Sequence, residues 1–148
     1  MALKDRIQDD MKTALRAKDK QRLGAIRLMV AAVKQREIDE RIDLNDAQTL
    51  VVLEKMLKQR RESLAQYQSA GREDLAAQEA FEIALIQEYL PTPLDPSALD
   101  ALIAQAITTS GAQSIRDMGK VMALVKEQAQ GRADLAAVSA QIKSQLGA

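Results

Sequence analysis

Residues 91–96 read PTPLDP, and this stretch decides how the chain is divided. It contains all three prolines of the protein. Proline lacks the backbone N–H that a helix needs and its ring clashes with the preceding turn, so no helix continues through such a stretch. We therefore predict a proline-rich linker at 91–96 between an N-terminal helical domain at 1–90 and a smaller domain at 97–148.

The composition on both sides of the linker favours helices. Hydrophobic residues make up 47% of the chain and charged residues 28%, as in a globular protein that buries a core. Aromatic residues are only 2%, so the core is built from Leu, Ile, Val, Met and Ala, which favours helices packed on helices over a sheet. We predict an all-α fold, with about four helices before the linker and three after it.

Apolar residues at helical spacing predict the helices before the linker. Side chains that cap a helix N-terminus and glycines that end a helix mark their limits. The third start resembles a capping box, in which Gln48 follows Asn45 by three residues. The four expected helices are one that ends near Lys18, one that Asp19 caps, one from Asn45 to Gly71, and one over roughly Glu73–Leu90.

Three shorter helices are predicted after the linker. Asp95 and Pro96 have the residue types that favour the N-cap and first position of the first helix. Ser114 with Asp117 resembles a capping box for the second helix. Gly131 is expected to end the second helix, and Asp134, three residues later, precedes an apolar run and is expected to cap the third.

A glycine falls inside the second of these helices, in SIRDMGKVM at residues 114–122. Glycine in a helix interior costs about 1 kcal/mol relative to alanine, so something should compensate for Gly119. It lets another helix approach, or it lets an RNA backbone lie close to a helix whose first turns favour anions. Both interpretations stay open, and under either one a larger residue at 119 should be harmful. Lys120 and Arg132 are among the basic residues nearby in the sequence.

Charge is balanced overall but uneven along the chain. Basic and acidic residues number 21 each, so the net charge predicts neither a nucleic-acid nor a membrane partner. Between Lys12 and Arg36, however, eight residues are basic and one is acidic, whereas between Arg72 and Asp100 seven are acidic and one is basic. The chain is therefore electrically polarised along its length.

Three cations of the basic segment recur every seven residues. Lys20, Arg27 and Lys34 therefore share one edge of the second predicted helix. One interpretation is that they bind phosphates without recognising the base sequence. The other is that they are long side chains whose aliphatic parts lie beside the core. The sequence leaves both interpretations open.

KQRRES, residues 58–63, places Arg60 and Arg61 in the apolar seam of the third helix. These arginines bind phosphate or carboxylate groups, or they pair with the acidic fourth helix as a structural clamp. We favour the clamp because acidic residues are plentiful in that helix.

The residue types of most active sites are missing. The chain has no cysteine and no histidine, which removes thiol nucleophiles, imidazole bases and the usual zinc ligands. Paired acids such as Asp9 and Asp10 are interpreted as a solvated face. We predict no catalytic residue, metal or cofactor. The sequence also shows no signal-like or membrane-spanning apolar run, so we expect a cytoplasmic protein without a membrane partner.

Several of these stretches together resemble the YqeY family, of the GatB/YqeY type. Their order and spacing cover nearly the whole chain. They are KDKQRLGAIRLMVAAVKQREI at 18–38, KQRRES at 58–63, AGREDL at 70–75, EYLP at 88–91, DMGKVM at 117–122, and GRAD at 131–134 with Val138-Ser139.

The resemblance implies that residues 95–146 are similar to the tail of the GatB subunit of glutamine-dependent aminoacyl-tRNA amidotransferase. In that enzyme the tail helps to hold the tRNA, and other parts perform the chemistry. The free-standing family is often placed under carbon–nitrogen ligase activity with glutamine as amido donor, through this kinship. The matching motif positions here are Gly119, Lys120, Gly131, Arg132 and Asp134.

We therefore expect a non-catalytic helical protein that binds tRNA or a tRNA-handling enzyme. One alternative is a protein-interaction module that uses the two charged segments, and another is an accessory to a carbon–nitrogen ligase activity. The expected nucleic-acid-binding residues are Lys20, Arg27, Lys34, Gly119, Lys120 and Arg132.

Overall fold

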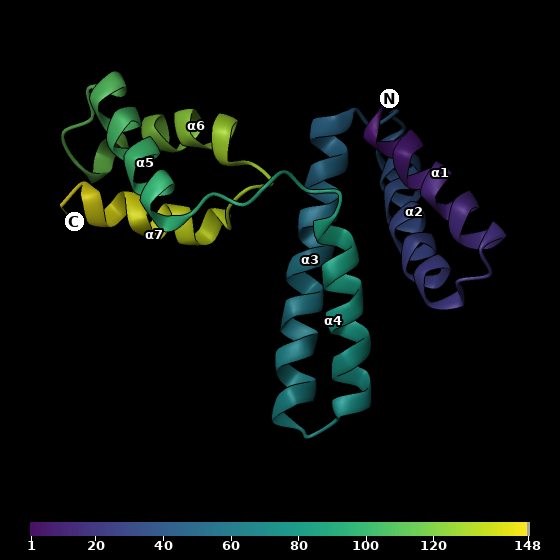
Figure 1. Cartoon of the computed structure of the whole chain (residues 1–148). Coiled ribbons are helices and arrows are strands. Elements are labelled where there is room, and N and C mark those ends of the chain that lie inside the picture. Colours follow the sequence, from purple (N-terminus) through teal and green to yellow (C-terminus); the bar gives the residue numbers. More distant parts are fainter. Residues whose placement is uncertain (148) are drawn as a thin grey trace. The chain divides into compact units, whose positions relative to one another are not determined.

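The computed structural model describes residues 1–147, which form seven α-helices and a single turn of 3-10 helix (Figure 1). No strand occurs among these residues, so the predicted all-α fold is confirmed. Contacts divide the chain into two compact units, residues 1–90 and 91–148. The elements are α1 (Leu3–Arg16), α2 (Lys20–Glu40), α3 (Asp46–Ser69), α4 (Glu73–Gln87), α5 (Pro96–Ser110), η1 (Ile115–Asp117), α6 (Met118–Ala129) and α7 (Leu135–Gln145).

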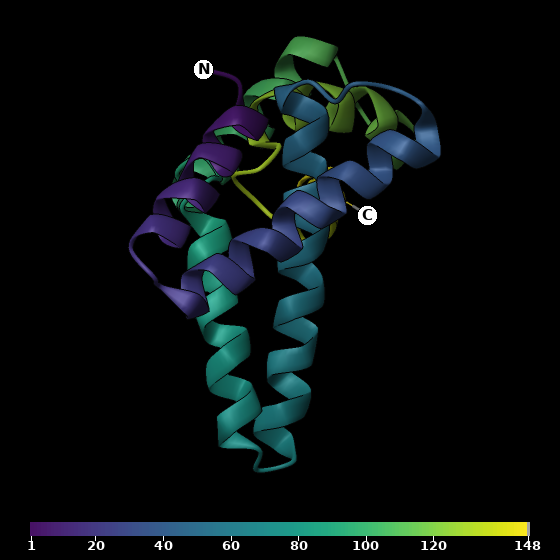
Figure 2. The same ribbon diagram turned by 90° about the vertical axis from the view of Figure 1, so that its right-hand side faces the viewer.

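Two helical hairpins make up the first unit. Helix α1 packs along α2, and α3 packs along α4. Helix α2 also lies against both α3 and α4, and Figure 2 shows it crossing that hairpin obliquely. The α3–α4 turn contains Gly71 with φ +70°, a left-handed conformation that favours glycine. Helix α2 therefore joins the two hairpins, and α1 also packs against α3.

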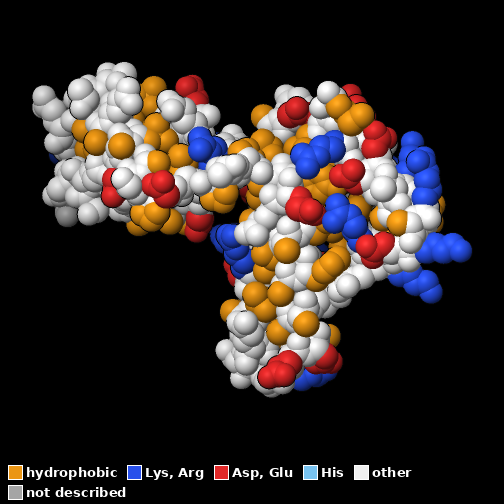
Figure 3. Space-filling view, in the orientation of Figure 1, with side chains coloured by type: hydrophobic (Ala, Val, Ile, Leu, Met, Phe, Trp, Pro, Cys, Tyr) orange, Lys and Arg blue, Asp and Glu red, His pale blue; other side chains and the backbone are white. Residues whose placement is uncertain are grey.

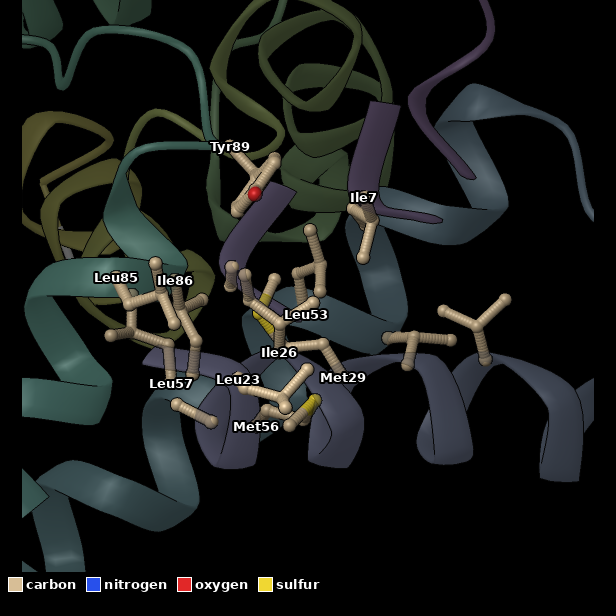
Figure 4. Packing of buried hydrophobic residues seen from close by; sticks show 14 of the residues in the cluster. Ile7, Leu23, Ile26, Met29, Leu53, Met56, Leu57, Leu85, Ile86 and Tyr89 are labelled. Carbon is tan, nitrogen blue, oxygen red and sulfur yellow. The ribbon is translucent and has the colours of Figure 1, made fainter. Parts of the chain in front are cut away.

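The core of the first unit forms where α2 meets α3 and α4. Figure 4 shows Ile26 of α2 close to Leu53 of α3 and Ile86 of α4. These three side chains are at most 1% exposed. Truncating a residue of this kind to alanine lowers the free energy of unfolding by about 2–5 kcal/mol, because apolar contacts are lost and a cavity is left. This packing fixes which side of α2 is turned away from the protein.

Side chains cap the starts of α2 and α3 as the sequence predicts. The Asp19 carboxylate accepts a hydrogen bond from the Arg22 N–H at 3.1 Å. Asn45 and Gln48 form a reciprocal capping box, with N···O distances of 2.9 and 3.0 Å. These bonds satisfy N–H groups that have no partner inside their own helix.

An ion pair joins α3 to α4, as the clamp interpretation predicts. Arg60 Nε lies 2.7 Å from Glu82 Oε2 and 3.8 Å from Glu79 Oε2. Burial and the nearby Glu82 carboxylate raise the pKa of Glu79, and the Arg60 charge opposes that shift. Arg61 is exposed and forms no ion pair within residues 1–147.

The second unit is a three-helix bundle with an aliphatic core. Helices α5, α6 and α7 pack against one another, and the best-buried side chains come from all three. Six of these side chains are 0% exposed: Ile103, Val121, Val125, Ala129, Val138 and Ile142.

Two of the three predicted N-caps in the second unit are confirmed. Asp95 accepts from the Ala98 N–H at 2.7 Å, and Asp134 accepts from the Ala136 N–H at 3.1 Å. The third start differs from the prediction.

The expected capping box at the start of α6 does not form. The Ser114 hydroxyl accepts from the Arg116 N–H at 3.3 Å, and the Asp117 carboxylate accepts from the Gln113 N–H at 3.0 Å. These bonds stabilise the 3-10 turn η1, so α6 begins only at Met118. Gly119 is therefore the second residue of a helix and does not lie in its interior.

A polar cluster fixes the end of α4 to α1 and α2. The Tyr89 hydroxyl donates a hydrogen bond to the Asp10 carboxylate, and the Arg6 guanidinium lies 4.7 Å from the centre of the Tyr89 ring. Arg22 of α2 pairs with Glu88 at 3.1 Å. The expectation that Asp10 belongs to a solvated face is therefore wrong.

Tyr89 should make the stability of the protein depend on pH in the alkaline range. Burial, followed by the hydrogen bond to Asp10, raises the pKa of the Tyr89 hydroxyl above its ordinary value. The folded protein then holds the proton of the Tyr89 hydroxyl more tightly than the unfolded chain does, in which tyrosines titrate at about pH 10. The stabilisation by Tyr89 is fully present below that pH and is lost as the pH rises beyond it.

We predict that Tyr89→Phe lowers the free energy of unfolding by about 1–2 kcal/mol at neutral pH, because it removes a hydrogen bond to a charged group. The variant should also show a shallower loss of stability above about pH 10. Urea unfolding at a series of pH values measures both effects. An equally steep alkaline decline in the variant and the wild type would show that Tyr89 is not the group responsible.

Candidate functional site

Helix α2 presents three predicted phosphate-binding residues on one exposed face. Lys20, Arg27 and Lys34 are all exposed and are separated by two helical turns, or about 10.5 Å along the axis. None of them forms an ion pair within residues 1–147. In Figure 3, Lys and Arg side chains project from the side on which α1 and α2 lie. We call these three residues the α2 cation row.

The other two cations of α2 are neutralised within the protein. Arg22 pairs with Glu88 at 3.1 Å, and Arg36 pairs with Glu40 at 2.6 Å. The cation row is therefore the positive charge of α2 that is left for a partner.

Small and apolar side chains share this exposed face with the cation row. Gly24 and Ala31 are exposed, and a Cβ atom added at Gly24 would meet no other atom within 4 Å. Leu28 is 44% exposed and Ile38 is 69% exposed. Sequence reasoning did not single out Gly24, although a glycine four residues after Lys20 in a predicted helix was a visible signal.

Gly119 lies open to solvent at the start of α6. A Cβ atom added there would meet nothing within 4 Å, so no part of the described chain uses the space. The helix-packing interpretation is therefore wrong for this structure, and a larger residue would meet no steric obstacle in the fold. The interpretation as a point of backbone approach stays a prediction.

Lys120 follows Gly119 in the first turn of α6 and has an acidic neighbour. Its ammonium lies 4.0 Å from Asp117, although the side chain is 71% exposed. A hydrogen bond from the Gln113 N–H is the main cause that lowers the pKa of Asp117, and the Lys120 charge adds to it. The positive charge of Lys120 is thus partly offset.

Arg132 holds the linker against the second unit. It lies half-buried in the turn between α6 and α7, where its Nε donates to the Thr92 carbonyl at 2.8 Å. Its own carbonyl accepts from the Leu94 N–H at 2.9 Å. The predicted phosphate-binding role of Arg132 therefore has to coexist with a structural one.

A small hollow lies between α1 and α2. Its volume is about 80 Å³, whereas ligand pockets measure roughly 300–1,000 Å³. Residues 1–147 contain no group of three or more side chains placed to hold a metal ion. No helix in that range combines the length and the apolar composition needed to span a bilayer. The hollow is lined by Lys4, Asp5, Ile7, Gln8, Val30, Val33, Lys34 and Glu37.

Comparison with known proteins identifies the family. A family model described as Yqey-like protein matches residues 4–146, which is almost the whole chain. The chain belongs to the Yqey-like protein family. The resemblance found in the sequence motifs is thereby confirmed, whereas the match makes no statement about tRNA or amidotransferases.

Curated relatives of this Yqey-like chain carry the name "Altered inheritance of mitochondria protein 41, mitochondrial". The relative from Pyrenophora tritici-repentis is 30% identical over 97% of this chain and 80% of its own length. The relative from Vanderwaltozyma polyspora is 39% identical over 57% of this chain and 46% of its own length. The relative from Kluyveromyces lactis is 34% identical over 69% of this chain and 57% of its own length. The matches thus span about half the length of these last two relatives.

The names of these relatives overturn the predicted location. They are mitochondrial proteins by name, and the sequence had predicted a cytoplasmic protein. That prediction rested on the lack of a signal-like apolar run, and such a lack does not distinguish the two compartments.

The linker contact of Arg132 yields a test within this Yqey-like chain. We predict that Arg132→Ala increases amide hydrogen exchange at Leu94 by about two- to tenfold, because one hydrogen bond that holds the linker is lost. Lys126→Ala, which removes an exposed cation at the end of α6, is the control and should leave the exchange unchanged. Equal exchange in the wild type and Arg132→Ala would mean that the side chain does not secure the linker.

Proposed function

We propose that this protein binds RNA through the α2 cation row and that it carries out no chemistry of its own. One observation carries the proposal: three exposed cations lie on one helix face and have no acidic partner within residues 1–147. Lys and Arg in such a row contact phosphates, and each contact releases counterions from the nucleic acid. Affinity then depends strongly on salt.

The zero net charge of the chain does not oppose this proposal, because acidic residues are engaged elsewhere. Glu79 and Glu82 lie against Arg60, and Glu88 pairs with Arg22. These three carboxylates come from the acidic segment of the sequence, and two arginines offset part of their charge. Their field on the α2 cation row is reduced to that extent.

Residues of the second unit provide a second set of candidate contacts. Gly119 leaves the first turn of α6 uncovered, and Lys120 projects from the same turn. Arg132 uses only its Nε for the linker among the hydrogen bonds of the described residues, so its other nitrogens are candidate phosphate donors. The resemblance of residues 95–146 to a tRNA-holding tail makes tRNA, or an enzyme that handles it, the first partner to test.

We predict that changing Lys20, Arg27 and Lys34 together to alanine weakens binding to total tRNA and flattens its salt dependence. The slope of log K against log salt should fall in magnitude by about 2–3, close to one for each phosphate contact that is lost. Filter binding across a salt series measures the slope.

Lys55 and Lys58 of α3 with Arg116 of η1 form a matched control, since they are also two lysines and one arginine, all exposed. Their triple alanine variant should keep the wild-type slope. An equal decrease of affinity and salt slope in both triple variants would show that only the total charge of the protein matters. Unchanged affinity and slope in the α2 variant would show that the cation row does not contact the RNA.

A protein partner is the second candidate, because the same face of α2 exposes apolar side chains. Ile38 is 69% exposed and Leu28 is 44% exposed. An acidic partner with an apolar stripe would match such a face. Binding of a purified tRNA-handling enzyme that survives nuclease treatment and is lost in Leu28→Ser/Ile38→Ser would favour this candidate over direct RNA binding.

A further inference from the structure

The exposed face of α2 alternates cations with small side chains. Lys20, Gly24, Arg27, Ala31 and Lys34 follow one another at spacings of four and three residues, so they form one ridge along the helix. The ridge is about 21 Å long. Along the ridge itself, Gly24 and Ala31 place no more than a methyl group between successive cations, and the exposed Leu28 lies beside the ridge.

No aromatic side chain lies on this face. The chain has two tyrosines and one phenylalanine, and none of them belongs to α2. Tyr89 is 4% exposed, and Phe81 packs against the core of the first unit. Proteins that hold single-stranded nucleic acid stack its bases on aromatic rings. The α2 face therefore offers phosphates positive charge but gives unpaired bases nothing to stack on.

We infer that the α2 face binds the sugar–phosphate backbone of double-helical RNA, independently of base sequence. This inference rests on the proposed RNA-binding function and specifies the class of RNA. In a paired stem the bases are already stacked, and phosphates and 2′-hydroxyls form the outer surface. The deep, narrow major groove excludes a helix of roughly 10 Å diameter, so α2 lies along the backbone and the shallow minor groove.

The glycine and the alanine have a defined role in this arrangement. A ribose–phosphate segment approaches the helix at Gly24 and Ala31, while the neighbouring cations reach phosphates on either side. A side chain at position 24 would hold the RNA away from the helix and lengthen these contacts. The fold would not suffer, because a Cβ atom at Gly24 meets nothing within 4 Å.

The experiment uses the full-length chain and three RNA probes: a hairpin, a second hairpin with its base pairs permuted, and one strand of the first stem alone. We expect equal affinity for the two hairpins and at least about tenfold weaker binding of the single strand. Gly24→Gln should weaken hairpin binding by about tenfold while raising the midpoint of thermal unfolding, since glutamine is the better helix former. Ala31→Gln provides a second variant that tests the same contact.

Ala80→Gln is the matched control, because it adds the same side chain at an exposed position of α4. It should change neither hairpin affinity nor the preference for paired RNA. Equal binding of strand and hairpin, or wild-type hairpin affinity in both Gly24→Gln and Ala31→Gln, would overturn the inference while leaving RNA binding intact. Failure of the wild-type protein to bind any of the probes would instead overturn the proposed function, and would favour an acidic protein as the partner of α2.

Discussion

The packing of α2 against α3 and α4 is the contact on which the rest of the first unit depends. Ile26 is fully buried in the cluster that also contains Leu53 and Ile86, so the rotation of α2 about its own axis is fixed. A helix that buries one face must turn the opposite face outward. The positions of Lys20 and Lys34 in solvent are thus a consequence of apolar packing on the other side of the same helix. The core determines the candidate site without contacting it.

Local features of the fold were predictable from the sequence, whereas contacts between distant residues were not. The cap at Asp19 and the capping box of Asn45 with Gln48 depend only on residues three positions apart, and both form as predicted. The hydrogen bond between Tyr89 and Asp10 joins residues 79 positions apart. Nothing in the local pattern around Asp10 distinguishes it from a solvated acid, because its partner is supplied by tertiary packing.

The candidate site was predictable for a similar reason, and only in part. The spacing of seven placed Lys20, Arg27 and Lys34 on one edge of a helix, since helical periodicity is a local property. The sequence could not tell which cations of α2 remain free, because Arg22 is neutralised by Glu88, 66 positions away. It also could not show that Arg132 bonds to the Thr92 carbonyl, 40 positions earlier. A charged side chain is available to a binding partner only if no other residue of the same protein already pairs with it.

The two glycines that lie within helices, Gly24 and Gly119, differ in what they cost the fold. Gly119 is the second residue of α6, where the N–H groups have no partner inside the helix in any case, so a glycine there needs little compensation. Gly24 is the fifth residue of a 21-residue helix, where glycine costs about 0.5–1 kcal/mol relative to alanine. Both positions have equally empty surroundings, so internal packing explains neither one. Only Gly24 therefore carries an uncompensated cost within the chain, and an approach from outside, between Lys20 and Arg27, is the compensation that its position allows.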